Sequence, residues 1–164
     1  MSIVKLIHKA LSDSDIRKIL GHDTKIIKYS ELSQFTDLDQ LLPNPVDYCI
    51  ILYEDDIDRG HWVGLSKYEG KYEHFDSYGL KPDKEVAWIN MKKRRLLQED
   101  EPYLSNLLKH EHVIHNTVRY QELDSGVNTC GLPFEEAENG SRRISQLHAV
   151  SQGRLQHELR YDRV

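Results

Sequence analysis

A short β-hairpin near the middle of the chain is the feature that most restricts its fold. Two strand-like runs, 61–68 and 71–76, are separated by Glu69-Gly70, a dipeptide suited to a tight turn. Such a turn pairs the last residue of the first run, Tyr68, with the first residue of the second, Lys71. Every other cross-strand partner in the hairpin then follows from this one pair.

This register brings two chemically useful side chains together. It places Val63 opposite Asp76 and His61 opposite Tyr78. Because side chains on one face of a sheet recur at every second residue, His61 and Asp76 are predicted to share a face. They become diagonal neighbours, roughly 7–8 Å apart at the backbone, within reach for long side chains. The sequence therefore predicts an imidazole beside a carboxylate.

Helix signals are clearest at the start of the chain. Ser12 is a suitable N-cap with Asp15 three residues later, and Gly21 follows a short apolar stripe. The other predicted elements are a short helix at 38–42, a buried strand at 47–53, a polar loop at 55–60, a helix from Asp83 to Leu97, a helix at 103–108 and a strand at 113–121.

Composition limits the class of protein. With 164 residues, 38% hydrophobic and 30% charged, the chain suits one soluble globular domain. A net charge of −5 argues against general nucleic-acid binding. There is no apolar run of membrane-spanning length, and the polar N-terminus does not resemble a signal peptide. Together with only two cysteines, these features indicate a reducing, intracellular setting and no membrane partner.

Four residues in chain order supply the groups that a thiol hydrolase needs. His61 is a candidate base, Asp76 its orienter, Gln121 an oxyanion donor and Cys130 the nucleophile. The alternative for Cys130 is a small core residue, which the polar Asn128-Thr129 before it disfavours. Gln121 would otherwise be a solvated strand end, and Asp76 a turn residue.

Several other residues compete for a role. By the hairpin count, His74 shares the face of Asp76, so it is an alternative base. Trp62 is either a core residue or a wall that keeps water from the His–Asp pair. Cys49 lies in an apolar run and is predicted to be buried. The basic run 92–95 is predicted to be the solvated face of a helix. His110, His112 and His115 have mixed spacings, so we predict no metal site and no cofactor.

The ordered motifs resemble those of the adenovirus-type (adenain-like) cysteine proteases, especially the versions from large DNA viruses and virophages. Ubiquitin-like-protein proteases belong to the same clan. The likeness extends from about residue 11 to residue 131. It depends on the set Gly60-His61-Trp62, Phe75-Asp76-Ser77-Tyr78-Gly79, Gln121 and Asn128-Thr129-Cys130-Gly131.

The resemblance implies an α+β fold with a mixed central β-sheet flanked by helices, in which the cysteine begins a packed helix. It also implies cleavage of viral capsid or core precursors during virion maturation, in the infected cell or the virion. His61, Asp76, Gln121 and Cys130 would be catalytic, and Trp62, Asn128 and Gly131 would contact substrate. A peptide or DNA activator is left open, as is the oligomeric state.

The C-terminal segment departs from the family. Relatives continue after Cys-Gly with an apolar helix, whereas this chain has Pro133 and then a run of acidic residues up to Gly140. We therefore divide it into a protease domain at 1–131 and an atypical segment at 132–164. A short or distorted helix is predicted at 131–139, followed by a loosely packed tail. An isopeptidase for ubiquitin-like modifiers and a catalytically impaired scaffold remain alternative functions.

Overall fold

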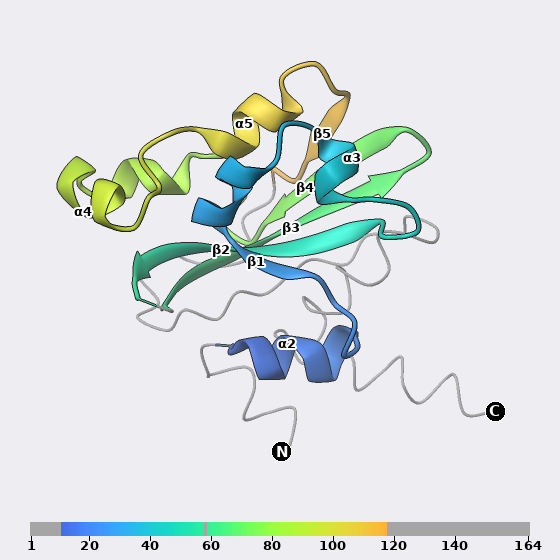
Figure 1. Ribbon diagram of the computed structural model, residues 1–164, viewed down its shortest axis with the longest axis horizontal. Coiled ribbons are helices and arrows are strands. Elements are labelled where there is room, and N and C mark those ends of the chain that lie inside the picture. The colour runs from blue at the N-terminus through green and yellow to red at the C-terminus, as the bar shows by residue number, and fades with distance from the viewer. Residues whose placement is uncertain (1–10, 58, 118–164) are drawn as a thin grey trace.

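The computed structural model describes residues 11–57 and 59–117. It is an α+β structure built on a five-stranded mixed sheet with strand order β1-β2-β3-β4-β5 (Figure 1). The strands are β1 (Ile26–Lys28), β2 (Tyr48–Asp56), β3 (Arg59–Tyr68), β4 (Lys71–Asp76) and β5 (Val113–His115). The two outer pairs, β1–β2 and β4–β5, are parallel, and the inner pairs are antiparallel.

The predicted hairpin is confirmed with its register. Tyr68 pairs with Lys71 and Val63 pairs with Asp76 across β3 and β4. Glu69 and Gly70 both have positive φ, 48° and 73°, as a tight turn between antiparallel strands requires. Ladder pairing stops at Asp76, two residues before Tyr78, the predicted partner of His61, because the chain turns away at residues 77 and 78.

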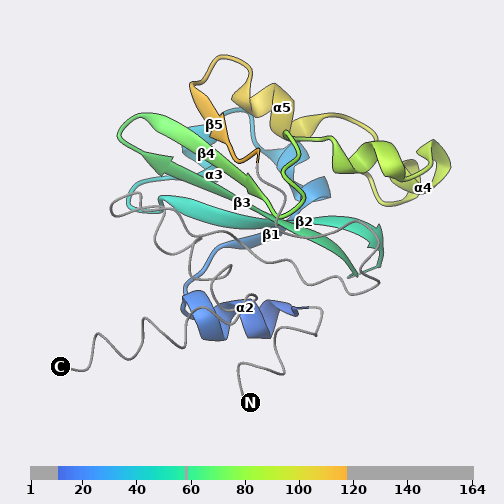
Figure 2. The same cartoon turned by 180° about the vertical axis from the view of Figure 1, so that it is seen from behind.

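Helices cover both faces of the sheet (Figures 1 and 2). On one face lies α2 (Asp13–Leu20), with the predicted Ser12 cap and Gly21 at its end. Its Ile16 and Leu20 pack on β2 and β3 side chains that include Trp62. The opposite face carries the 3-10 helices η1 (Tyr29–Gln34) and η2 (Glu85–Trp88), with α3 (Leu38–Leu41), α4 (Met91–Leu96) and α5 (Tyr103–Leu108). None of these helices has the length and apolar character needed to cross a bilayer.

Cys49 is confirmed as a core residue. Its side chain is fully buried with Ile51, Val63 and Leu65 on the face that α5 covers. Burial raises the pKa of the Cys49 thiol to about 12, so this thiol stays protonated and unreactive near neutral pH.

Three predicted boundaries were wrong. The polar loop at 55–60 is shorter than predicted, because β2 runs to Asp56 and β3 begins at Arg59 around an irregularity in the ladder. The predicted helix from Asp83 to Leu97 is two pieces, η2 and α4, and Asn90 caps the second. Of its basic run, Lys92 and Arg95 are exposed as expected, whereas Lys93 and Arg94 are half-buried. Within the described part of the predicted strand at 113–121, only Val113–His115 is a strand.

Asp83 explains why the long helix does not form. Its φ is +65°, a left-handed conformation that cannot begin a helix. Its carboxylate instead accepts hydrogen bonds from the Tyr29 and Tyr53 hydroxyls, at 2.6 and 3.0 Å, and from the Ser105 backbone N–H at 2.7 Å. Asp83 therefore caps α5, whose own N-cap residue, Pro102, offers no side-chain acceptor.

We expect Asp83→Ala to lower the free energy of unfolding by about 2–3 kcal/mol, because two hydroxyls and one N–H lose their acceptor in a largely buried region. Asp83→Asn should cost less, since asparagine tolerates positive φ and keeps one acceptor oxygen. Urea unfolding midpoints of the two variants and the wild type measure this order. Equal midpoints for all three would contradict the role assigned to Asp83.

Candidate active site

The predicted base and orienter are in contact. His61 Nε2 lies 2.7 Å from Asp76 Oδ1, and the two side chains come from adjacent strands, β3 and β4. The Asp76 side chain is fully buried, whereas that of His61 keeps 13% of its surface exposed. The shared face predicted from the hairpin register is thereby confirmed. One side of the imidazole is held by the carboxylate, and the ring is still reachable from outside.

Asp76 is held on several sides. Its Oδ1 also accepts the backbone N–H of Tyr78 at 2.8 Å. Its own backbone N–H and C=O are both bonded to the side-chain amide of Asn116, at 2.9 and 2.6 Å. Asn116 follows β5 directly. The carboxylate therefore has little freedom to turn away from His61.

The charge state of Asp76 follows from these contacts. Burial alone would raise its pKa, but the hydrogen bond from His61, the adjacent Glu85 carboxyl and the charge of His61 bring the pKa below the usual value. Asp76 is therefore ionised and can only accept, so the hydrogen between the two residues belongs to His61 Nε2. The remaining ring nitrogen, Nδ1, then carries the lone pair that a general base needs.

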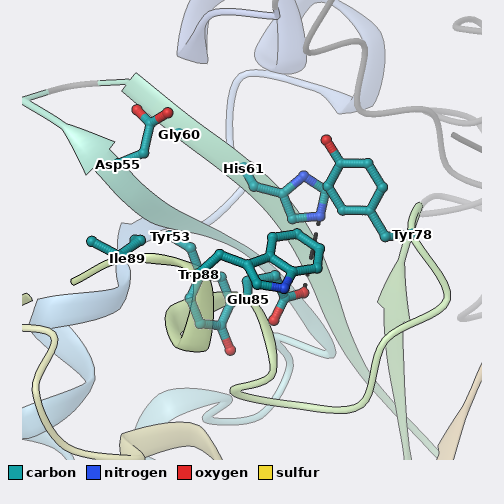
Figure 3. Close-up of a pocket in the computed structure, with 8 residues that line it drawn as sticks. All are labelled: Tyr53, Asp55, Gly60, His61, Tyr78, Glu85, Trp88 and Ile89. Carbon is teal, nitrogen blue, oxygen red and sulfur yellow. Dashed lines mark ion pairs between the residues drawn. The ribbon is translucent and has the colours of Figure 1, made fainter. Parts of the chain in front are cut away.

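An aromatic wall lies against the imidazole. The Tyr78 ring stacks on His61 with centroids 4.4 Å apart, and Trp88 meets Tyr78 edge-on at 5.7 Å. These rings, with Tyr53, Glu85 and Ile89, line a cavity of about 440 Å³ that opens beside His61 (Figure 3). A cavity of this size can hold a large side chain of a bound peptide.

Gly60 is required at this site by the close approach of two backbones. A Cβ atom at this position would lie 1.8 Å from the carbonyl oxygen of Tyr53 on the neighbouring strand. A distance this short is a clash with backbone, so the glycine before His61 lets β3 run against β2 beside the cavity.

The expected substrate-binding role of Trp62 needs correction. Its side chain is 8% exposed and belongs to the core on the α2 face, opposite to His61. Its indole N–H donates to the Leu11 carbonyl oxygen at 2.8 Å. The core alternative is therefore confirmed, and Tyr78 and Trp88 form the wall beside His61 in its place. The other candidates, Gln121, Asn128, Cys130 and Gly131, lie outside the described residues, as does the whole segment 132–164.

Glu85 was missed by sequence reasoning. It is 3% exposed, and its Oε1 lies 4.0 Å from His61 Nε2. An acidic residue in the first turn of a helix normally faces solvent, so nothing in the sequence marked it. His61, Asp76 and Glu85 are also the group of described residues whose ligand atoms, all within 4.8 Å of one another, come nearest to a metal site. His110, His112 and His115, which are all among the described residues, do not form such a group.

His74 is a core residue and not an alternative base. It lies on β4 between Leu65 and His115, is fully buried, and neither ring nitrogen has a hydrogen-bond partner among the described residues. Burial lowers its pKa to about 4, so the ring is neutral near pH 7.

A known viral protein is similar in sequence to this chain. The chain is 34% identical over 125 residues to the uncharacterized protein V9 of Sputnik virophage, in an alignment that covers 74% of this chain and 71% of V9. No known protein-family model matches the chain. The match supports the expectation of a viral protein. The name of V9 states no activity, so the activity has to be inferred from the chemistry of the site.

The depressed pKa of His74 predicts an acid-sensitive fold. The unfolded chain takes up a proton here below pH 6.5, whereas the folded state resists it until about pH 4. Stability should therefore be fully present above pH 6.5 and fall by about 2–3 kcal/mol as the pH approaches 4. His74→Leu should remove this part of the pH dependence. The exposed His110→Leu is the control, and equal slopes in both variants would contradict the assignment.

Proposed function

We propose that this chain, which belongs to the same family as protein V9 of Sputnik virophage, is a cysteine peptidase of the adenain-like type. The observation that carries the proposal is the 2.7 Å hydrogen bond between His61 and Asp76 beside an open cavity. The five-stranded α+β architecture is compatible with this class of enzyme. The order of candidate groups along the chain, with Gln121 and Cys130 after the pair, supports the same conclusion.

In the proposed reaction, His61 Nδ1 takes the proton of the Cys130 thiol while Asp76 holds Nε2–H and stabilises the imidazolium that results. The thiolate attacks the carbonyl carbon of a peptide bond. The amide of Gln121 donates to the oxyanion that develops. His61 then returns its proton to the leaving amine, and water releases the acyl group from the sulfur. No cofactor takes part.

The proposed substrates are capsid or core precursor proteins of a virus. The viral relative and the resemblance to maturation proteases support this choice. Isopeptide-linked ubiquitin-like modifiers are the substrates to test against. If this chain cleaves modifier conjugates and leaves the precursors intact, it is an isopeptidase. If it cleaves neither, it is a scaffold.

Only Cys130 should react quickly with a peptide that carries a thiol-directed electrophile near pH 7. Cys49 is fully buried with its pKa raised to about 12, whereas Cys130 has a proposed base. Mass spectrometry after labelling the wild type, Cys130→Ala and Cys49→Ala measures this. We expect Cys49→Ala to label like the wild type and Cys130→Ala to stay unlabelled. Equal labelling of both cysteines in the native protein would contradict the assignment of Cys130 as the nucleophile.

His61→Ala and Asp76→Asn should each lower kcat by on the order of 10²–10⁴, because the first removes the base and the second removes the negative charge that stabilises the imidazolium. His74→Leu is the matched control, since it changes a buried histidine on the same strand as Asp76 without touching His61. It should keep wild-type turnover of a precursor peptide at pH 7. Loss of activity in His74→Leu with full activity in His61→Ala would reverse the assignment.

A further inference from the structure

Three buried carboxyl oxygens beside His61 lack a hydrogen-bond donor among the described residues. With both acids taken as ionised, Asp76 Oδ2 and both oxygens of Glu85 have no donor within the described part of the chain. Glu85 is 3% exposed and lines the cavity, with its carboxyl turned toward the His61 ring (Figure 3). Buried acceptors without a donor raise the free energy of the folded state. A proton on one of these oxygens would therefore stabilise the arrangement.

Two adjacent buried carboxyls cannot both be ionised cheaply. Asp76 keeps the charge because its Oδ1 already accepts from His61 Nε2 and from the Tyr78 N–H. Within residues 11–57 and 59–117, Glu85 has no such donors. Burial raises its pKa, and the adjacent Asp76 carboxylate raises it further. Glu85 is therefore the member of the pair that carries a proton.

The titratable groups around this pair come from several elements. They are Tyr53 on β2, His61 on β3, His74 and Asp76 on β4, and Asp83 before η2. His74 is neutral, and Asp83 is already bonded to two tyrosine hydroxyls and the Ser105 N–H. Apart from His61, these described neighbours supply no cation that would compensate an ionised Glu85.

We propose that Glu85 is a positioning residue: as a neutral carboxylic acid it donates its O–H to Asp76 Oδ2 and so keeps Asp76 Oδ1 turned toward His61 Nε2. An ionised Glu85 would instead compete with Asp76 for the Nε2 hydrogen. The effect of Glu85 on turnover rests on the proposed peptidase function. The proton and the hydrogen bond do not.

A metal ion fits the same three residues less well than a proton does. Two ligands of one tetrahedral zinc ion, each about 2.0–2.1 Å from the metal, are separated by roughly 3.3 Å. His61 Nε2 and Asp76 Oδ1 are 2.7 Å apart, which is a hydrogen-bond distance. The geometry therefore points to a shared hydrogen at this site and not to coordination.

Infrared difference spectra of the full-length protein test the protonation directly. In D2O near neutral pH, the wild type and the exposed control Glu111→Gln should both show the C=O stretch of a buried carboxylic acid. Glu85→Gln should lack that band, and the difference spectrum separates it from any contribution of Glu99, whose pKa burial raises to about 7. A wild type without this band, or with it only after EDTA treatment, would overturn the proposal in favour of a carboxylate or a metal ligand.

Proton NMR and turnover test the positioning. Glutamine keeps a neutral donor of nearly the same size, so Glu85→Gln should retain the downfield His61 Nε2–H resonance and wild-type kcat within about threefold. Glu85→Ala should lose or shift that resonance and lower kcat by on the order of 10² with little change in KM. If Glu85→Gln were as impaired as Glu85→Ala, the proposed role would be wrong.

The two proposals can fail separately. If the wild type shows the acid band and the downfield resonance but cleaves no peptide, the proposed Glu85–Asp76 hydrogen bond stands and the proposed peptidase function is wrong. If the wild type cleaves precursor peptides while Glu85 is ionised, the proposed function stands and the proposed positioning role of Glu85 is wrong.

Discussion

The register of the β3–β4 hairpin is the constraint on which the site depends. A slip of one residue would turn His61 and Asp76 to opposite faces of the sheet. The same register buries Val63 and Leu65 in the core, each worth roughly 1.5–3 kcal/mol on removal from water. The energy that holds the His–Asp pair in contact is therefore mostly hydrophobic, and it comes from residues that have no chemistry of their own.

Local signals made much of this fold readable. The Glu69-Gly70 turn, the Ser12 cap and the alternation of side chains between the two faces of β3 all act between close neighbours in the sequence. The contact of His61 with Asp76 could be predicted for the same reason, since only one turn separates the two strands. The predicted thiol and oxyanion donor lie far along the chain, and their identification depended on the order of motifs.

Long-range partners could not be predicted from these signals. Asp83 looked like the cap of the helix that follows it, but its carboxylate bonds α5 and two tyrosines from η1 and β2. Glu85 carried no signal in the sequence, and η2 places it beside Asp76. Trp62 stood beside His61 in the sequence, and the alternation of the strand sends it to the other core. For Asp83 and Glu85, tertiary contacts decided where the side chain lies.

The placement of the two tryptophans gives the molecule an intrinsic optical reporter. Trp62 is 8% exposed and bonded to the Leu11 carbonyl oxygen, whereas Trp88 is 56% exposed at the mouth of the cavity. A collisional quencher such as iodide reaches the second indole and spares the first. Because Trp88 meets the Tyr78 ring that stacks on His61, a molecule entering the cavity would alter the emission of one fluorophore while the other serves as an internal reference.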